Sequence, residues 1–190
     1  NNLSAQPTKL TAFDGAEGDY FGVSVSATND KIIVGANADG DKGAYSGSVY
    51  VYDANDLSAQ PTKLTAFDGA EFDQFGRTVA ANADKIIVAV EYDDDNGISS
   101  GSVYVYDAND LSAQPTKLTA FDAAADDAFG SSVAATDDKI VVGARNNDDK
   151  GRDSGSVYVY DANDLSATPT KLTAFDGDVT DYFGYSVAVG

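Results

Sequence analysis

The 190 residues include 31 acidic and 12 basic side chains, giving a formal charge of −19, and contain no Cys, His, Met or Trp. Without His and Cys, the chain cannot use Ser-His-Asp or Cys-His catalysis, imidazole or thiolate metal sites, or disulfides. The charge disfavours nucleic acid and anionic membranes, and no apolar run approaches the roughly 18 residues of a membrane helix. We therefore expect no nucleic-acid partner and no membrane insertion.

The sequence repeats every 54 residues, about three and a half times. One hexapeptide, Gly-Ser-Val-Tyr-Val-Tyr, recurs at Gly47–Tyr52, Gly101–Tyr106 and Gly155–Tyr160. A long period of this kind predicts a solenoid, a propeller or a similar array. Features present in every repeat then belong to the scaffold, and features that vary between repeats are better candidates for specific function.

Each repeat predicts four strands, taken here from the first full repeat. The first strand, Phe21–Ala27, is short and rich in small residues. The second, Lys31–Ala36, is a continuous apolar run, typical of a strand covered on both faces. The third, Ser48–Asp53, alternates Val and Tyr, and the fourth, Thr62–Phe67, follows Pro61. Clusters of Asp, Asn and Gly separate the strands, and nothing indicates an amphipathic helix.

The fourth strand of each repeat has the residues of an exposed edge. A proline precedes it, and a lysine lies within it: Lys9, Lys63, Lys117 and Lys171. Proline and lysine are common protection for exposed strand edges. The first strand, with its small residues, suits a crowded centre. Four antiparallel strands per repeat, stacked face to face around an axis, make a β-propeller, which we favour over a β-solenoid.

The fold expected for residues 1–190 is therefore a single all-β array of four-stranded antiparallel blades. The three complete blades span residues 21–67, 75–121 and 129–175. Residues 1–14 would supply the outer strand of one incomplete blade, and residues 183–190 the inner strand of another. Propellers have 4–8 blades, so this array closes no ring by itself. Either the chain is a processed form or part of a longer array, or neighbouring copies complete the blade and build rings or filaments.

Three motifs of each repeat together resemble the FG-GAP repeat of integrin α-subunit propellers and of bacterial surface proteins. They are Phe-Gly-x-Ser-Val, Ile-Val-Val-Gly-Ala (at Ile140–Ala144) and Gly-Ser-Val-Tyr-Val-Tyr. The resemblance covers essentially the whole chain and implies an extracellular or cell-surface location, in bacteria. The chain departs from the pattern where Asn37 and Arg145 replace a proline. The connection Thr28-Asn29-Asp30 is too short for the integrin-type calcium loop, so that site is not carried over.

The strand order places most of the charge on one face of the disc. The loops between second and third strands, and the crossovers between blades, emerge on the same side. Together they hold 21 acids, opposed by four bases: Lys42, Arg145, Lys150 and Arg152. Carboxylates crowded in this way raise one another's pKa unless a cation neutralises them. We call this side the acidic loop face.

Calcium is the cation that the acidic loops favour, because it takes 6–8 oxygen ligands from carboxylates and carbonyls. Three loop clusters, each completed by an acid from a crossover, predict these ligands: Asp39, Asp41, Asp93, Asp95, Asp148, Asp149, Asp19, Asp73 and Asp127. In the alternative interpretation, Asp, Asn and Gly only form turns, with Asx-turns closing the loops and the charge serving solubility.

These features predict a non-catalytic function. Carboxylates occur everywhere, so no pair stands out as a glycosidase acid and base, and no catalytic residue is expected. We expect an extracellular scaffold or adhesion module, stabilised by Ca²⁺, that self-assembles and binds copies of itself or a cell-surface protein or glycan. A lectin-like propeller and an engineered or recently amplified repeat protein without ligand stay open. Contact candidates are the residues that vary between repeats: Tyr45, Phe72, Tyr92, Ile98, Arg145, Arg152 and Tyr185.

Overall fold

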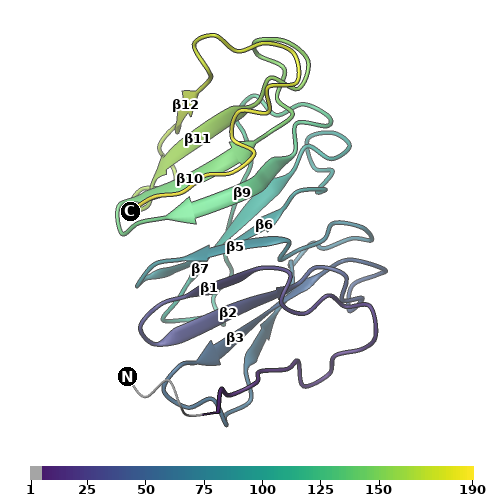
Figure 1. Cartoon of the computed structure of the whole chain (residues 1–190), viewed down its shortest axis with the longest axis vertical. Helices are drawn as coiled ribbons and strands as arrows, with labels where there is room; N and C mark the ends of the chain where they lie inside the picture. The colour runs from purple at the N-terminus through teal and green to yellow at the C-terminus, as the bar shows by residue number, and fades with distance from the viewer. Residues whose placement is uncertain (1–5) are drawn as a thin grey trace.

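The computed structural model describes residues 6–190, which form three four-stranded antiparallel sheets and no helix (Figure 1). Blade 1 contains β1 (Val25–Ala27), β2 (Lys31–Ala36), β3 (Ser48–Asp53) and β4 (Thr62–Leu64). Blade 2 contains β5 (Thr78–Ala81), β6 (Lys85–Val90), β7 (Ser102–Asp107) and β8 (Thr116–Leu118). Blade 3 contains β9 (Phe129–Ala135), β10 (Lys139–Ala144), β11 (Ser156–Asp161) and β12 (Thr170–Leu172).

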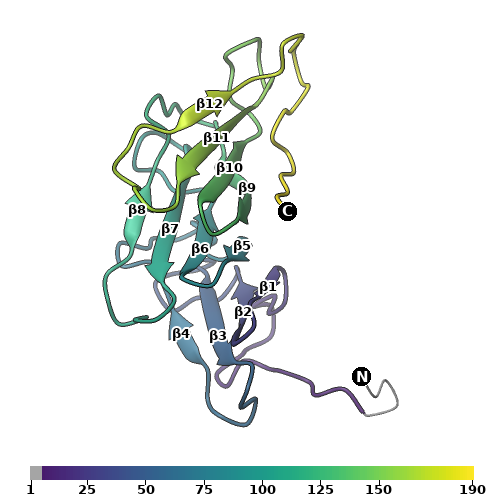
Figure 2. The same ribbon diagram turned by 90° about the vertical axis from the view of Figure 1, so that its left-hand side faces the viewer.

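The three blades stack face to face, with the first strands β1, β5 and β9 along one side and the fourth strands along the other (Figure 2). Within each blade the strands are hydrogen-bonded in chain order. This arrangement confirms the expected all-β fold of four-stranded antiparallel propeller blades. Within residues 6–190, there is no helix that could cross a membrane.

The hairpin of second and third strands is the most regular part of each blade. In blade 1 it runs from the pair Lys31–Asp53 to the pair Ala36–Ser48, and the other blades keep the same register. Along β3, Val49 and Tyr50 are both buried although they point to opposite faces of the sheet. Both faces are therefore covered, as the continuous apolar composition predicts.

The hydrophobic core lies between neighbouring blades. In the interface of blades 1 and 2, Ile33 and Val49 of one sheet share a buried cluster with Val88 and Tyr104 of the next. The Phe of the Phe-Gly pair that begins each blade (Phe21, Phe75 or Phe129) packs edge-on against a tyrosine of that blade, as Phe75 does on Tyr104 with ring centroids 5.5 Å apart. Such edge-to-face pairs add about 0.5–1.5 kcal/mol beyond their buried area. The tyrosines are thus core residues.

The fourth strands, and the first strands of blades 1 and 2, are shorter than the sequence predicts, whereas β9 has the full expected length. The strand expected at Phe21–Ala27 begins only at Val25, where pairing with β2 starts, and the Gly22 N–H donates separately to the Gly35 carbonyl. The strand expected at Thr62–Phe67 ends at Leu64, where pairing with β3 stops. The ends of both strands depend on how far the ladder with the neighbouring strand extends, which residue composition alone does not fix.

The two terminal segments also differ from the expectation, since residues 6–14 and 183–190 form no strand; residues 1–5 lie outside the described residues. A strand exists only where a neighbour pairs with it. The second and third strands that would flank these segments in a complete blade are not in the chain. The segments nevertheless follow the path of their internal counterparts: Ser132 Oγ donates to the Gly184 carbonyl at 2.8 Å, as Ser24 does to Gly76 at 2.7 Å.

Candidate functional site: the acidic loop face

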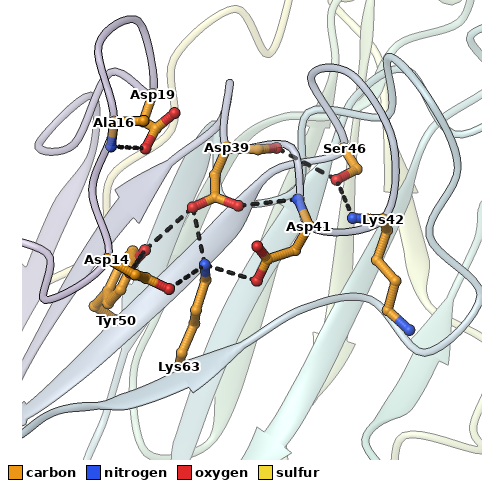
Figure 3. Close-up of polar contacts among 9 residues, drawn as sticks. All are labelled: Asp14, Ala16, Asp19, Asp39, Asp41, Lys42, Ser46, Tyr50 and Lys63. Carbon is orange, nitrogen blue, oxygen red and sulfur yellow. Dashed lines mark hydrogen bonds and ion pairs between the residues drawn. The ribbon is translucent and has the colours of Figure 1, made fainter.

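A lysine lies at the centre of the acidic cluster of blade 1 (Figure 3). Lys63 Nζ forms ion pairs with three carboxylates: Asp14 Oδ2 at 2.8 Å, Asp39 Oδ2 at 3.0 Å and Asp41 Oδ2 at 2.7 Å. The Tyr50 hydroxyl completes the cluster, with its one proton directed to Asp14 Oδ1 at 2.6 Å and Asp39 Oδ2 as a second, longer contact at 3.1 Å. The ammonium occupies the position that the sequence assigned to calcium.

Strand register brings this lysine to the loop face. Lys63 on β4 is paired with Tyr50 on β3, so both side chains lie on the same side of the sheet. Lys63 Nζ lies 5.3 Å from the centroid of the tyrosine ring, and only 12% of the lysine side chain is exposed. The interpretation of these lysines as exposed edge protection is therefore wrong for Lys63, Lys117 and Lys171, whose side chains are equally covered.

Blade 2 repeats the cluster. Lys117 Nζ pairs with three carboxylates: Asp68 at 2.9 Å, Asp93 at 2.7 Å and Asp95 at 2.6 Å. The Tyr104 hydroxyl donates to Asp68, as Tyr50 does to Asp14. A unit that recurs with the same geometry is part of the scaffold.

Blade 3 carries a reduced form of the cluster. Lys171 Nζ pairs with Asp122 at 2.6 Å and with Asp149 at 2.5 Å. Asn147 stands where the other blades have a third Asp, and its Oδ1 accepts from Ser156 Oγ at 2.8 Å. Asp148, a predicted calcium ligand, instead accepts a hydrogen bond from the Asp153 backbone N–H at 2.7 Å.

The clusters shift the pKa of both partners in opposite directions. Burial by itself lowers the pKa of Lys63, but hydrogen bonds to the three carboxylates outweigh it and raise the pKa above its usual value. Burial raises the pKa of Asp14, and the hydrogen bonds from Lys63 and Tyr50 outweigh it and hold that pKa below its usual value. Both groups therefore stay charged near neutral pH.

The three crossover acids predicted as calcium ligands form hydrogen bonds within their own loops. Asp19, Asp73 and Asp127 each accept a hydrogen bond from the backbone N–H three residues earlier, at 2.6, 2.7 and 2.9 Å. They close their own loops and do not reach a lysine. Burial raises the pKa of Asp73 to about 6, and the neighbouring Asp93 adds to this rise. Burial likewise raises the pKa of Asp127.

The nine predicted calcium ligands therefore differ in the groups that they contact. Five of them, Asp39, Asp41, Asp93, Asp95 and Asp149, contact a lysine ammonium. Within residues 6–190, no group of three or more acidic side chains is arranged to hold a metal ion. The Asx-turn interpretation has direct support, because Asp39 Oδ1 accepts from the Asp41 N–H at 3.2 Å. Calcium binding stays a prediction.

Sequence reasoning missed the three lysines and their crossover partners Asp14, Asp68 and Asp122. The available signal was the constant spacing in each repeat between the first Tyr of the hexapeptide and the lysine, as in Tyr50 and Lys63. On paired antiparallel strands this spacing places the two side chains on one face, pointing to the acidic loops.

A second polar feature crosses the blades at a position that varies between repeats. Residues 37, 91 and 145 are equivalent and carry Asn, Glu and Arg. Glu91 is 1% exposed, and its carboxylate pairs with Arg77 Nε at 2.7 Å and with an Arg145 terminal nitrogen at 2.6 Å. Arg145 in turn lies over the Tyr185 ring, 5.6 Å from its centroid. These variable residues join blade 2 to blade 3.

The other variable residues are exposed on the loops. Tyr45 and Phe72 stack across the boundary of blades 1 and 2, with ring centroids 5.9 Å apart, and both remain exposed. Ile98 and Arg152 are also largely exposed. Of the predicted contact candidates, these four and Tyr185 are exposed, whereas Tyr92 and Arg145 are half-buried.

A pair of equivalent hollows lies at the blade junctions, away from the lysine clusters. The hollow beside blades 2 and 3 has a volume of about 420 Å³, and its lining includes Asp84, Asn109 and Gln114. The hollow beside blades 1 and 2 has a volume of about 250 Å³, and its lining includes Asp30 and Asn55 at the equivalent positions. Carboxylates and amides in a concave site can hydrogen-bond hydroxyl groups.

Comparisons with known proteins agree with this architecture. The FG-GAP repeat family matches residues 5–52, 59–106 and 113–160, and each match ends in the third strand of a blade. No curated protein matches the sequence. Among solved structures, the computationally designed Ika4 protein is similar, with a TM-score of 0.52 and 17% identity over 91% of this chain and 82% of that chain. That likeness concerns the fold. The three family matches recur once per 54-residue repeat and together cover more than half of the chain, so this chain belongs to the FG-GAP repeat family.

Proposed function

We propose that this protein is a non-catalytic scaffold or adhesion module that acts outside the cell, in bacteria, and self-assembles. The observation that carries the proposal is the repeated lysine cluster. The acids nearest to one another, such as Asp39 and Asp41, are held in ion pairs with Lys63, so they support the loop conformation. FG-GAP repeats are typical of extracellular proteins.

The acidic loop face would present the contact surface. Tyr45, Phe72 and Ile98 are exposed on loops that internal ion pairs hold in place. Exposed aromatic and aliphatic side chains on rigid loops are common anchors of protein contacts. The partner would be a cell-surface protein or a glycan.

An adhesion assay tests this proposal. Beads coated with the chain should adhere to bacterial cells more than beads coated with a Phe72→Ser and Ile98→Ser variant, which keeps the fold and the net charge. Equal retention of the two bead types would contradict a contact surface at these loops.

Calcium is proposed as a stabiliser that competes with the lysines. Lys63 Nζ lies 2.7–3.0 Å from the carboxylates, so Ca²⁺ can bind Asp39 and Asp41 only after the ammonium moves away. A ligand that binds only the folded state raises its stability. We expect millimolar Ca²⁺ to raise the melting temperature relative to EDTA, and Mg²⁺ to do so less. An equal melting temperature in Ca²⁺ and EDTA would exclude calcium.

A lectin is the second candidate, because the hollow of about 420 Å³ beside blades 2 and 3 is lined by Asp84, Asn109 and Gln114. A glycan array separates the two candidates. Retention of one sugar class that is lost in Asn109→Ala and Gln114→Ala would favour the lectin. If no sugar on the array binds, the lectin is excluded and the scaffold proposal stands.

A further inference from the structure

Each end of the blade stack exposes an apolar surface that the interior of the stack buries. Val25 on β1 is 60% exposed, whereas Val79 and Val133 at the same repeat position are 7% and 8% exposed. At the other end Leu172 on β12 is 44% exposed, whereas Leu64 and Leu118 are each 6% exposed. Since the residue types are identical, the exposure arises only because no further blade covers these faces.

The two end faces are the two halves of the interface that already joins the blades. In the interior, Ile33, Val49, Val51 and Leu64 of blade 1 share a buried cluster with residues of blade 2. Their equivalents on the outer side of blade 3 are Val141, Val157, Val159 and Leu172. Leu172 is exposed, Val141 and Val159 are half-buried, and Val157 is buried beside Gly184 of the C-terminal segment. The blade 2 side of the interface includes Val79 and Val88, and their equivalents on the outer side of blade 1 are Val25 and Val34. Val25 is exposed, whereas Val34 is buried in the cluster against which the N-terminal segment packs. The end faces thus complement each other, and neither complements itself.

We propose that blade 3 of one copy of this chain docks on blade 1 of a second copy, in the geometry that blade 2 takes on blade 1. This inference rests on the self-assembly included in the proposed function and names its surfaces. The contact is head-to-tail, so it closes into a ring or grows into a filament. Propellers have 4–8 blades. Two copies supply six blades and three copies would supply nine, so the ring contains two copies.

At the free side of blade 1, the N-terminal segment occupies part of the docking face. Leu10 and Ala12 pack against the cluster of Tyr50 and Tyr52, and the Tyr52 hydroxyl donates to the Thr11 carbonyl at 2.8 Å. In the interior of the stack, the preceding blade supplies this segment: the Tyr106 hydroxyl donates to the Thr65 carbonyl.

A second copy can replace this segment with an identical one. Residues 10–15 and residues 172–177 share the sequence Leu-Thr-Ala-Phe-Asp-Gly. In the docked pair, Asp176 of one copy would take the place of Asp14 beside Lys63 and Tyr50 of the other. Every hydrogen bond and ion pair that is broken is therefore remade with the same chemical groups, and the apolar area buried between the blades is the net gain.

The C-terminal segment is replaceable in the same way. Phe183 pairs with Gly155 on blade 3, in the manner of Phe75 with Gly47 on blade 1. Residues 19–22 and 181–184 both read Asp-Tyr-Phe-Gly, and the interior repeats have Gln74 or Ala128 in place of the Tyr. The segment that begins blade 1 of the second copy thus matches the one it displaces.

Sedimentation velocity of the 190-residue chain at micromolar concentration tests the proposal. We expect twice the 19.7 kDa chain mass. Leu172→Glu should give a monomer, and so should Val25→Lys, because each variant places a charge in one of the two end faces. The matched control is Ile98→Glu, which changes an exposed apolar residue of a loop and should leave the dimer intact.

Mixing the two end-face variants distinguishes head-to-tail docking from face-to-face pairing. The Leu172→Glu copy keeps its blade 1 face and the Val25→Lys copy keeps its blade 3 face, so the mixture should restore a dimer through one intact interface. Circular dichroism melting verifies that both variants fold. A wild-type monomer at all concentrations, or an oligomer that survives Leu172→Glu, would overturn the proposal. The bead assay is independent of assembly, so failure of adhesion is a separate result.

Discussion

At the scale of single residues, the fold handles its negative charge with buried lysines. Lys63 is 12% exposed and Asp39 is 5% exposed, so their ion pair is shielded from water on most sides. A carboxylate left without its partner in such a place carries its full desolvation cost. The lysine clusters therefore hold the loops to the outer strands.

Replacement of Lys63 tests this role. Lys63→Met keeps the apolar stem but leaves Asp39 unpaired, and loss of one partner of a buried ion pair costs about 3–5 kcal/mol. Because Asp14 and Asp41 are partly exposed, we expect about 2–3 kcal/mol in urea unfolding. Lys42→Met is the matched control: Lys42 is exposed, and its side chain points away from the cluster in Figure 3. It removes the same charge, so equal losses would contradict the cluster's role.

Asp73 should make stability depend on pH in the opposite sense to most acids. Burial raises its pKa from 3.8 to about 6. A carboxyl whose folded-state pKa is raised contributes stability below its unfolded pKa, and that contribution is lost as the pH rises through about 6. Asp73→Asn keeps an oxygen acceptor for the Ala70 N–H without the charge.

At pH 7.5 the free energy of unfolding of the Asn variant should exceed that of the parent by about 2–3 kcal/mol, since one pKa unit corresponds to about 1.36 kcal/mol. At pH 4 the two proteins should be about equally stable. Chemical unfolding at the two pH values checks this. Asp19→Asn, at the equivalent but more exposed position, should change little. A variant that destabilises at pH 7.5 would show that the charge of Asp73 is needed.

At the scale of elements, the strands within a blade differ in how well the sequence predicted their bounds. The bounds of β2 and β3 are those expected, because a strand covered on both faces carries its own apolar signal. The strands β1 and β4 are shorter than expected, because their ladders with β2 and β3 contain only three residue pairs each. The link through Glu91 was missed, since only the structure shows that blade 3 supplies Arg145 opposite it.

The Glu91 link should hold blades 2 and 3 together. Glu91→Ala leaves Arg77 and Arg145 facing each other without their shared carboxylate, and we expect a loss of about 3 kcal/mol. In a double-mutant cycle with Arg145→Ala, the coupling energy should be about 1–3 kcal/mol. Arg152→Ala removes an exposed arginine whose ion pair with Asp153 spans 3.4 Å, and should cost less than about 0.5 kcal/mol. Additive effects of Glu91→Ala and Arg145→Ala would rule out the link.

At the scale of the whole molecule, charge and exposed apolar surface act against each other. Each copy carries −19, which opposes contact between copies, while the end faces favour it. Salt screens charge repulsion, with a Debye length of about 10 Å at 0.1 M. The proposed dimer should therefore tighten between 0.05 and 0.5 M NaCl in sedimentation equilibrium. If the Leu172→Glu variant shows no stronger association at high salt, the salt effect arises at the end faces. If the wild-type dimer instead weakens as the salt concentration rises, ion pairs hold the contact.

The amino-acid sequence by itself determined the repeat, the strand order and the family resemblance, because apolar periodicity and turn residues are local signals repeated in each unit. It also placed the acidic residues on one side. Only the tertiary structure decided what those acids contact. Lys63 and Asp14 are 49 positions apart, and Lys63 and Asp39 are 24 apart. Their contact depends on the pairing of β3 with β4 and on the path of the crossover, which arise when the blades fold and stack.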